Sequence, residues 1–179
     1  MNDDSALLSA LRAIQARGAI GEASLEQAIV HAEQFVAALP AGLSTLVDLG
    51  SGGGLPGLVI AVRRPELHVT LVERRQSRAD LLSRAVRSLD LGGHVSVLAG
   101  DVRMLGESAP GSFDAVTARS FAAPPITAYW AGVLLRSGGR LVVSEPPVDD
   151  LIRWPADLLV TSGLVDQGRE QGVRIFSRV

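Results

Sequence analysis

The ten residues from Asp48 to Gly57, Asp-Leu-Gly-Ser-Gly-Gly-Gly-Leu-Pro-Gly, constrain the fold more than any other segment of the chain. They follow the apolar segment 43–47 and precede the apolar segment 58–62, an order that predicts a strand, a tight turn and a helix. Glycines in such a turn let the backbone approach a ligand, and the start of the helix offers free N–H groups and the positive end of its dipole. The turn predicts a nucleotide-like cofactor; the alternative is an ordinary tight connection between strand and helix.

Strand and helix signals alternate around this turn. The predicted strands are 46–49, 68–72, 94–98, 113–118 and 140–144, and the helices between them are 55–63, 77–89 and 125–135. Such alternation indicates right-handed βαβ units and an α/β fold of Rossmann-like type, with a mostly parallel, twisted sheet and helices on both faces. The last two β-prone runs, 164–168 and 173–178, predict a C-terminal antiparallel hairpin. A terminal hairpin is more typical of a class I methyltransferase than of a dehydrogenase.

Two helices are predicted before the first strand. Leu7, Leu8, Leu11 and Ile14 share one face of the first, and Ser24 and Gln27 have the spacing of a capping box at the start of the second. A length of 179 residues suits one domain. We therefore expect a single methyltransferase domain over 1–179, with a helical N-terminal extension over 1–40 and the cofactor-binding core over 43–179.

Composition excludes several classes of site. The chain has no cysteine and no lysine, and its 17 basic and 19 acidic residues give a net charge of −2. Disulfides, thiolate zinc sites and P-loop chemistry are excluded, and the three scattered histidines predict no metal site. A domain that grips nucleic acid by bulk charge is usually strongly basic, so any RNA contact needs a local arginine patch. Without a signal-like start or an apolar run of about 18 residues, we expect a cytoplasmic protein with no membrane contact.

Acidic residues close the first three predicted strands. Ligands of doubly wound sheets bind beyond the carboxyl ends of the strands. Asp48 could orient the glycine turn or accept from a cofactor amine, and Glu73 stands where an acid accepts both hydroxyls of a ribose. Asp101, or the amide of Val102, could hold an adenine edge. A single acid in such a position is usually a helix cap, but three at successive strand ends indicate a cofactor site.

The spacing of the glycines indicates which cofactor binds. Gly50, Gly52 and Gly54 form G-x-G-x-G instead of the G-x-G-x-x-G that holds a pyrophosphate. This pattern favours a cofactor without phosphate, such as S-adenosylmethionine (SAM). The predicted cofactor-binding residues are Asp48, Gly50, Ser51, Gly52, Gly54, Leu55, Glu73, Arg74, Asp101, Val102 and Arg119.

Fewer residues point to the substrate. Arg119 follows the fourth strand, where its guanidinium could bind a phosphate or a base, or form a salt bridge with a strand-end acid. A cluster of arginines lies on and before the second helix of the core: Arg74, Arg75, Arg78, Arg84 and Arg87. Such a cluster most often forms a solvated helix face, and RNA contact is the alternative. Glu145-Pro146-Pro147 loosely matches the Asn-Pro-Pro-Tyr motif of amino-group methyltransferases. We expect Trp130 and Trp154 to serve packing, and stacking of one of them on the substrate is the alternative.

The segment 48–57 resembles the Asp-Val-Gly-Ser-Gly-Ala-Gly-Leu-Pro-Gly signature of the small-subunit ribosomal RNA methyltransferase G family, also called glucose-inhibited division protein B. The segment 113–122 is similar to that family's stretch from Phe-Asp into Ser-Arg-Ala-Phe-Ala, and 138–141 to its Gly-Gly-Arg-Phe strand. The resemblance covers about residues 17 to 145. It implies transfer of a methyl group from SAM to N7 of a guanine in 16S rRNA or the 30S subunit, leaving S-adenosylhomocysteine, with Arg119 as the catalytic residue.

Several positions depart from the family pattern. Asp101 stands where the family has an arginine, Glu145 near its lysine, and Gln34-Phe35 where Asp-Ser follows the histidine that His31 matches. These changes fall on the RNA side of the resemblance. Two alternatives therefore stay open: a SAM-dependent methyltransferase that acts on a small molecule, and a non-catalytic protein with the same fold that binds a partner.

Overall fold

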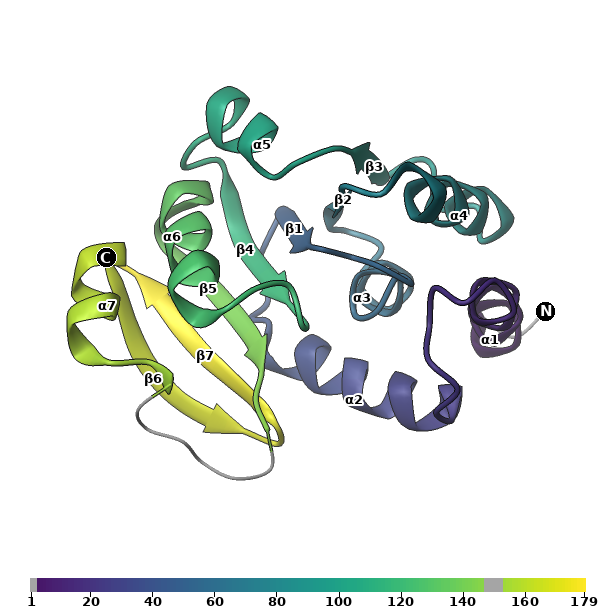
Figure 1. Ribbon diagram of the computed structural model, residues 1–179, viewed down its shortest axis with the longest axis horizontal. Coiled ribbons are helices and arrows are strands. Elements are labelled where there is room, and N and C mark those ends of the chain that lie inside the picture. The colour runs from purple at the N-terminus through teal and green to yellow at the C-terminus, as the bar shows by residue number, and fades with distance from the viewer. Residues whose placement is uncertain (1–2, 147–152) are drawn as a thin grey trace.

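The computed structural model describes residues 3–146 and 153–179, which form one seven-stranded sheet with helices on both faces (Figure 1). The strand order is β3-β2-β1-β4-β5-β7-β6. The strands are β1 (Thr45–Leu49), β2 (His68–Glu73), β3 (Val95–Ala99), β4 (Phe113–Ala118), β5 (Leu135–Ser144), β6 (Leu164–Glu170) and β7 (Val173–Arg178). The first five are parallel, and β7 runs antiparallel to both β5 and β6. This arrangement confirms the predicted α/β fold with its C-terminal hairpin.

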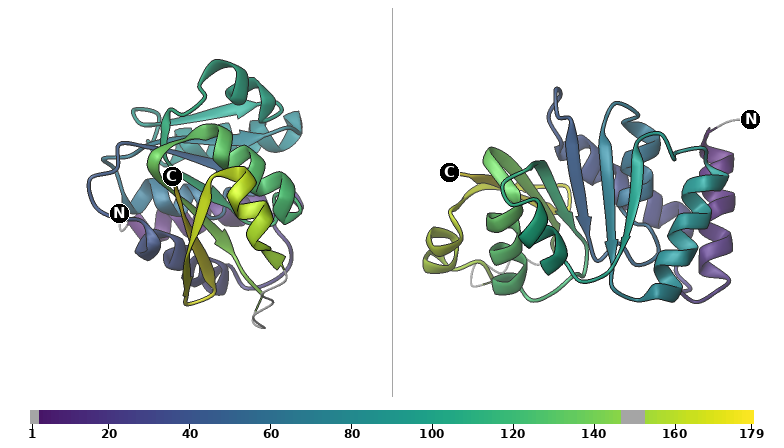
Figure 2. Two further views of the ribbon diagram at one scale, coloured as in Figure 1. Left: turned by 90° about the vertical axis from the view of Figure 1, so that its left-hand side faces the viewer. Right: turned by 90° about the horizontal axis from the view of Figure 1, so that it is seen from above.

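Seven helices are described. They are α1 (Asp3–Gln15), α2 (Leu25–Ala38), α3 (Gly57–Arg63), α4 (Gln76–Ser88), α5 (Arg103–Ser108), α6 (Pro124–Leu134) and α7 (Ala156–Ser162). Helices α1 to α4 cover one face of the sheet, and α5 to α7 cover the other (Figures 1 and 2). None of the described helices has the length and apolarity that a crossing of a lipid bilayer requires.

Alternate side chains along the strands belong to two buried clusters, one on each face of the sheet. Leu46 of β1 packs with Leu11 of α1 and Phe35 of α2, whereas the next residue, Val47, packs with the α6 side. Consecutive strand residues point to opposite faces, so a strand covered on both sides is apolar throughout. The two N-terminal helices thus share their core with the sheet, and Ser24 caps α2 as predicted by accepting from the Gln27 amide at 3.3 Å.

The main differences from the predicted helices are one later start and two helices that were not predicted. Helix α3 begins at Gly57 instead of Leu55, because Leu55 and Pro56 still belong to the turn. Helices α5 and α7 were not predicted. Both are short, at 6 and 7 residues, and neither contains a buried residue that would mark an apolar face.

Candidate active site

The carboxyl ends of the central strands meet at one level of the sheet. Leu49 of β1 pairs with Val72 of β2 and with Ala118 of β4. The Ser51 amide donates to the Val72 carbonyl at 2.9 Å, which ties the glycine turn to β2. Because β1 lies between β2 and β4, this is the point where strand order reverses, and ligands of doubly wound folds bind there.

The glycine turn is packed tightly against the helix that follows it. Gly54 has a φ of +91°, and a Cβ there would lie 2.4 Å from Cδ1 of Leu58. Both observations exclude a side chain at this position. The packing therefore favours a fixed shape for the turn, of which Gly50 lines the pocket described below.

Glu73 joins the turn to the end of β2. Its buried carboxylate accepts from the Gly52 amide at 3.1 Å through Oε2 and from the Arg75 amide at 2.8 Å through Oε1. A carboxylate has about four acceptor positions, so each oxygen can accept one further hydrogen bond. Two backbone hydrogen bonds thus hold the predicted ribose acceptor, Glu73, in place. Its carboxylate can still accept two further hydrogen bonds.

A pocket of about 430 Å³ lies at these strand ends. It is lined by Gly50, Val72, Glu73, Arg74, Arg75, Arg78, Gly100, Asp101, Val102, Ser120, Phe121, Ala122, Ile126 and Trp130. Five of the predicted cofactor residues are in this lining: Gly50, Glu73, Arg74, Asp101 and Val102. Phe121, Ile126 and Trp130 supply an apolar wall that was not predicted; Ile126 and Trp130, four residues apart on α6, share one helix face.

Asp48 lies beneath the turn. It is 1% exposed, its Oδ1 accepts from the Thr117 hydroxyl at 2.7 Å, and Oδ2 has no hydrogen-bond partner among the described residues. A Cβ on Gly57 would lie 2.7 Å from Oδ2. Burial raises the pKa of Asp48 to about 6, although the Thr117 hydrogen bond opposes the change. Asp48 is placed to orient the turn, and its predicted contact with a cofactor amine stays a prediction.

Four other predicted cofactor residues form the turn without lining the pocket: Ser51, Gly52, Gly54 and Leu55. The Ser51 hydroxyl donates to the Asp48 carbonyl at 2.9 Å, which closes the turn on itself. These residues therefore fix the shape of the turn and do not belong to the lining of the pocket.

Asp101 lies at the rim of the pocket. Its Oδ1 accepts from the backbone amide of Arg103 at 3.0 Å and from that residue's Nε at 3.2 Å. The bond from the Arg103 amide is the main cause that holds the pKa of Asp101 below its usual value. Asp101 thus stays charged, and it binds the first backbone amide of α5 while it lines the pocket.

Arg119 faces a second pocket. This cavity, of about 350 Å³, is lined by His31, Arg119, Ser120, Ser144, Glu145, Pro146 and Arg153. Ser120 lines both pockets, so the two adjoin. The half-buried guanidinium of Arg119 forms no ion pair with any described residue, contrary to the salt-bridge alternative. Burial lowers its pKa, and the charge of Asp48 opposes this. The structure places Arg119 in the lining of the second pocket and outside the lining of the first, and its predicted roles stay predictions.

Arginines also extend away from the first pocket. Arg78 lines it and a neighbouring groove that includes Arg17 and Arg84. None of these three has a carboxylate partner within residues 3–146 and 153–179. Across the same residues no group of three or more acidic or histidine side chains could hold a metal ion. Arg78 and Arg84 belong to the predicted arginine cluster, and its contact with RNA stays a prediction.

The motif Glu145-Pro146-Pro147 falls partly outside the described residues, which exclude Pro147. Glu145 is buried and accepts from Nε1 of Trp154 at 2.8 Å. Trp154 packs on Phe176 with ring centroids 4.8 Å apart, as predicted for a packing residue. Trp130 differs, because it combines packing with a place in the pocket wall.

The strand order, the glycine turn and the pocket beyond the strand ends define the fold of class I methyltransferases. The chain is similar to an O-methyltransferase family protein from Burkholderia thailandensis, with a TM-score of 0.67, 17% identity, and coverage of 83% of this chain and 55% of the other. It is also similar to a geranyl diphosphate methyltransferase solved in complex with SAM, with a TM-score of 0.66, 17% identity, and coverage of 84% and 85%.

The model of the family GidB, rRNA small subunit methyltransferase G, matches residues 21–145, and the chain belongs to this family. It is 45% identical over 108 residues to ribosomal RNA small subunit methyltransferase G of Salinispora tropica, which covers 58% of this chain and 44% of that protein. The corresponding protein of Neisseria meningitidis serogroup C is 35% identical over 121 residues, covering 66% and 56%. The chain thus spans about half the length of these curated relatives.

Proposed function

We propose that this protein is a SAM-dependent methyltransferase that methylates N7 of a guanine in 16S rRNA, as the free RNA or within the 30S subunit. The observation that carries the proposal is the pair of adjoining pockets at the switch point of the sheet, joined at Ser120. One pocket suits the cofactor and the other the methyl acceptor. Membership of the rRNA methyltransferase G family supports the choice of RNA. Because that substrate is cytoplasmic, we place the protein in the cytoplasm.

The first pocket has the groups that SAM requires. Glu73 would accept hydrogen bonds from the two ribose hydroxyls through its remaining lone pairs. Asp101 or the Val102 amide would bind the adenine edge. The backbone at Gly50 would pass along the methionine part, and Trp130 would cover the cofactor from the α6 side. When bound, SAM supplies an electrophilic methyl group on its sulfonium.

Guanine N7 as the acceptor atom places no demand on the site for a general base. N7 of guanine carries a free lone pair in the plane of the base, so its alkylation needs no proton removal. Catalysis then depends on alignment of the two reactants and on exclusion of water. Arg119 would hold the acceptor by its base or phosphate beside the cofactor pocket, and its freedom from ion pairs with described residues leaves all its donors available.

The small-molecule alternative is favoured by two observations. Glu145 places a carboxylate in the lining of the acceptor pocket, and the net charge is −2. The non-catalytic alternative predicts no methyl transfer to any acceptor. One assay of labelled methyl transfer to RNA separates both alternatives from the main proposal, because neither predicts a methylated RNA.

That assay uses labelled SAM with 30S subunits or 16S rRNA that lack N7 methylation. We expect incorporation into RNA by the wild-type protein and its loss in Arg119→Ala. Arg84→Ala, which removes a guanidinium from the neighbouring groove outside both pockets, should retain most of the activity. Incorporation into neither RNA form would overturn the RNA proposal, and absence of SAM binding in calorimetry would overturn every methyltransferase reading.

A further inference from the structure

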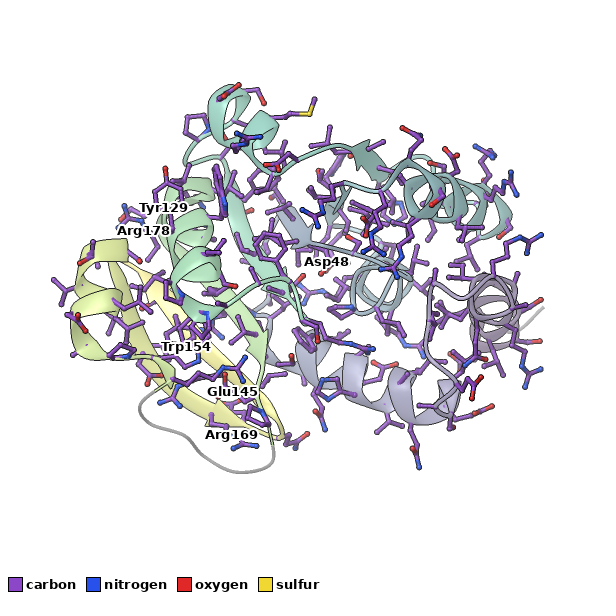
Figure 3. All side chains as sticks on the ribbon, in the orientation of Figure 1. Asp48, Tyr129, Glu145, Trp154, Arg169 and Arg178 are labelled. Carbon is purple, nitrogen blue, oxygen red and sulfur yellow. The ribbon has the colours of Figure 1, made fainter. Side chains whose placement is uncertain are left out.

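Glu145, directly after β5, has a buried oxygen that nothing in the described residues satisfies. Its side chain is 0% exposed, and Oε1 accepts from Nε1 of Trp154 at 2.8 Å. Oε2 has no hydrogen-bond partner in the described part of the chain. Figure 3 shows Glu145 and Trp154 near each other beside β5 and β7, with Asp48 farther along the sheet.

Such an orphaned acceptor is costly. A buried polar group without a hydrogen bond loses the full free energy of its hydration, and the loss is larger for a charged group. Nε of Arg153 lies 3.7 Å from Oε1, which is an ion-pair distance but too long for a hydrogen bond. The bond from Trp154 is directed at the same oxygen, Oε1. Oε2 therefore remains available for a donor that a ligand brings.

The surroundings of Glu145 indicate the kind of ligand. Glu145 and Arg119 line the same pocket of about 350 Å³, which adjoins the cofactor pocket through Ser120. The carboxylate only accepts hydrogen bonds when ionised, and the guanidinium only donates them. The pocket thus suits a planar group with N–H donors beside a carbonyl acceptor.

Guanine has this pattern on its Watson–Crick edge: the N1–H and N2–H₂ donors lie next to O6, and N7 stays free. Adenine presents a bare N1 acceptor there, which would face the carboxylate lone pairs. We propose that Glu145 is a specificity-determining residue that accepts from the guanine N1–H and N2–H₂ groups through Oε2, while Arg119 donates to O6. This inference rests on the proposed function and assigns the recognition of its acceptor base.

Two neighbours assist this role. Trp154, packed on Phe176, fixes Oε1 and so sets the direction of Oε2; it is a positioning residue. Arg153 lines the same pocket, with its Nε 3.7 Å from Oε1, and in this proposal it moves aside when the base enters. Because the Glu145 side chain is 0% exposed, the N–H donors of the base have to replace this ion pair when Arg153 moves.

The two tryptophans of the chain allow the pocket to be tested without catalysis. Trp130 lines the cofactor pocket, and the indole N–H of Trp154 is bonded to Glu145. In nitrogen-15 spectra of the protein saturated with S-adenosylhomocysteine, guanosine monophosphate should shift the Trp154 indole signal and adenosine monophosphate should not. Glu145→Gln, which keeps an oxygen for Trp154 but replaces one acceptor by a donor, should lose this preference.

Glu66→Gln is the matched control, because the same change falls on an exposed carboxylate that pairs with Arg64 near the start of β2. It should behave as wild type. An unchanged Trp130 signal in Glu145→Gln shows that the variant is folded. No shift with guanosine monophosphate, an equal shift with adenosine monophosphate, or a preference retained in Glu145→Gln would each overturn the proposal.

Methyl transfer adds a second readout. A transcript made with inosine in place of guanosine lacks the N2 amino group, so the wild-type protein should methylate it at least about tenfold more slowly. Glu145→Gln should be slow on both transcripts and show little difference between them. If the wild type methylates no RNA but Trp154 still responds only to the guanine nucleotide, the assigned pocket stands and the proposed function fails. Equal rates on both transcripts overturn the inference alone.

Discussion

The Thr117 hydroxyl of β4 and the Asp48 carboxylate of β1 face each other as register partners on neighbouring parallel strands, joined by a 2.7 Å hydrogen bond. This contact spans the switch point of the sheet and lies beneath the glycine turn. It holds a fully buried carboxylate at the base of the proposed cofactor site, and it makes the stability of the site depend on one hydroxyl group.

Thr117→Val should therefore destabilise the protein, because it leaves a second oxygen of Asp48 without a donor. We expect a loss of about 1–3 kcal/mol in the free energy of unfolding, measured by urea denaturation at pH 8. The loss should be smaller at pH 5, where the carboxyl is largely protonated. Thr70→Val, on the half-buried part of β2, serves as the control and should change stability little. Equal stability of Thr117→Val and the wild type at pH 8 would contradict this assignment.

Asp48 should also make stability depend on pH. Its pKa of about 6 in the folded protein lies above the ordinary value of 3.8, so the folded state binds the proton more tightly. The contribution of Asp48 is thus fully present below about pH 4 and is lost as pH rises through 6, a change of about 3 kcal/mol. Asp48→Asn should remove this part of the pH profile in denaturation curves recorded from pH 4 to pH 8. An Asp48→Asn profile parallel to that of the wild type would show that Asp48 titrates normally.

Gly54→Ala tests the fixed shape of the turn. With φ at +91° and only 2.4 Å between the new Cβ and Cδ1 of Leu58, the alanine would be strained, and the Leu58 side chain or the turn would have to shift. We expect a loss of stability of at least about 1 kcal/mol together with weaker SAM binding, both of which a thermal-shift titration with SAM measures. Gly92→Ala has nothing within 4 Å of its new Cβ and should leave both quantities unchanged. A fully functional Gly54→Ala would mean that the turn does not shape the site.

Glu73→Gln tests the ribose contact. The amide can accept one backbone hydrogen bond but cannot accept from both the Gly52 and Arg75 amides and two hydroxyls as well. SAM affinity in calorimetry should fall by about 1–3 kcal/mol. Asp80→Asn, an exposed acid on the neighbouring α4, should bind SAM as the wild type does. Unchanged affinity in Glu73→Gln would place the ribose elsewhere.

The fold could be predicted from the sequence because its signals are local. Alternating strands and helices, the capping spacing at Ser24 and the glycine turn each follow from a few consecutive residues, and the comparisons confirm the family that the turn resembles. Helix α5 carried no such signal, since its 6 residues include Gly106 and bury no side chain.

The site was predicted in part. Glu73, Asp101 and Val102 could be placed because strand ends converge in a parallel sheet. Trp130 could not be assigned to the pocket, since α6 is apolar on most of its surface and its sequence does not show which face meets the ligand.

Two relationships depend on contacts between distant parts of the chain. The bond from Thr117 to Asp48 joins residues 69 positions apart, and the bond from Trp154 to Glu145 joins the segment before α7 to the end of β5.

The most direct test of the account is to identify the methylated nucleoside. The protein is incubated with SAM and 30S subunits or 16S rRNA that lack N7 methylation, and the RNA is digested to nucleosides and analysed by mass spectrometry against standards. The account predicts 7-methylguanosine as the product, formed by the wild-type protein and abolished in Arg119→Ala. A methyl group on any other atom or base, or the same yield from Arg119→Ala, would contradict it.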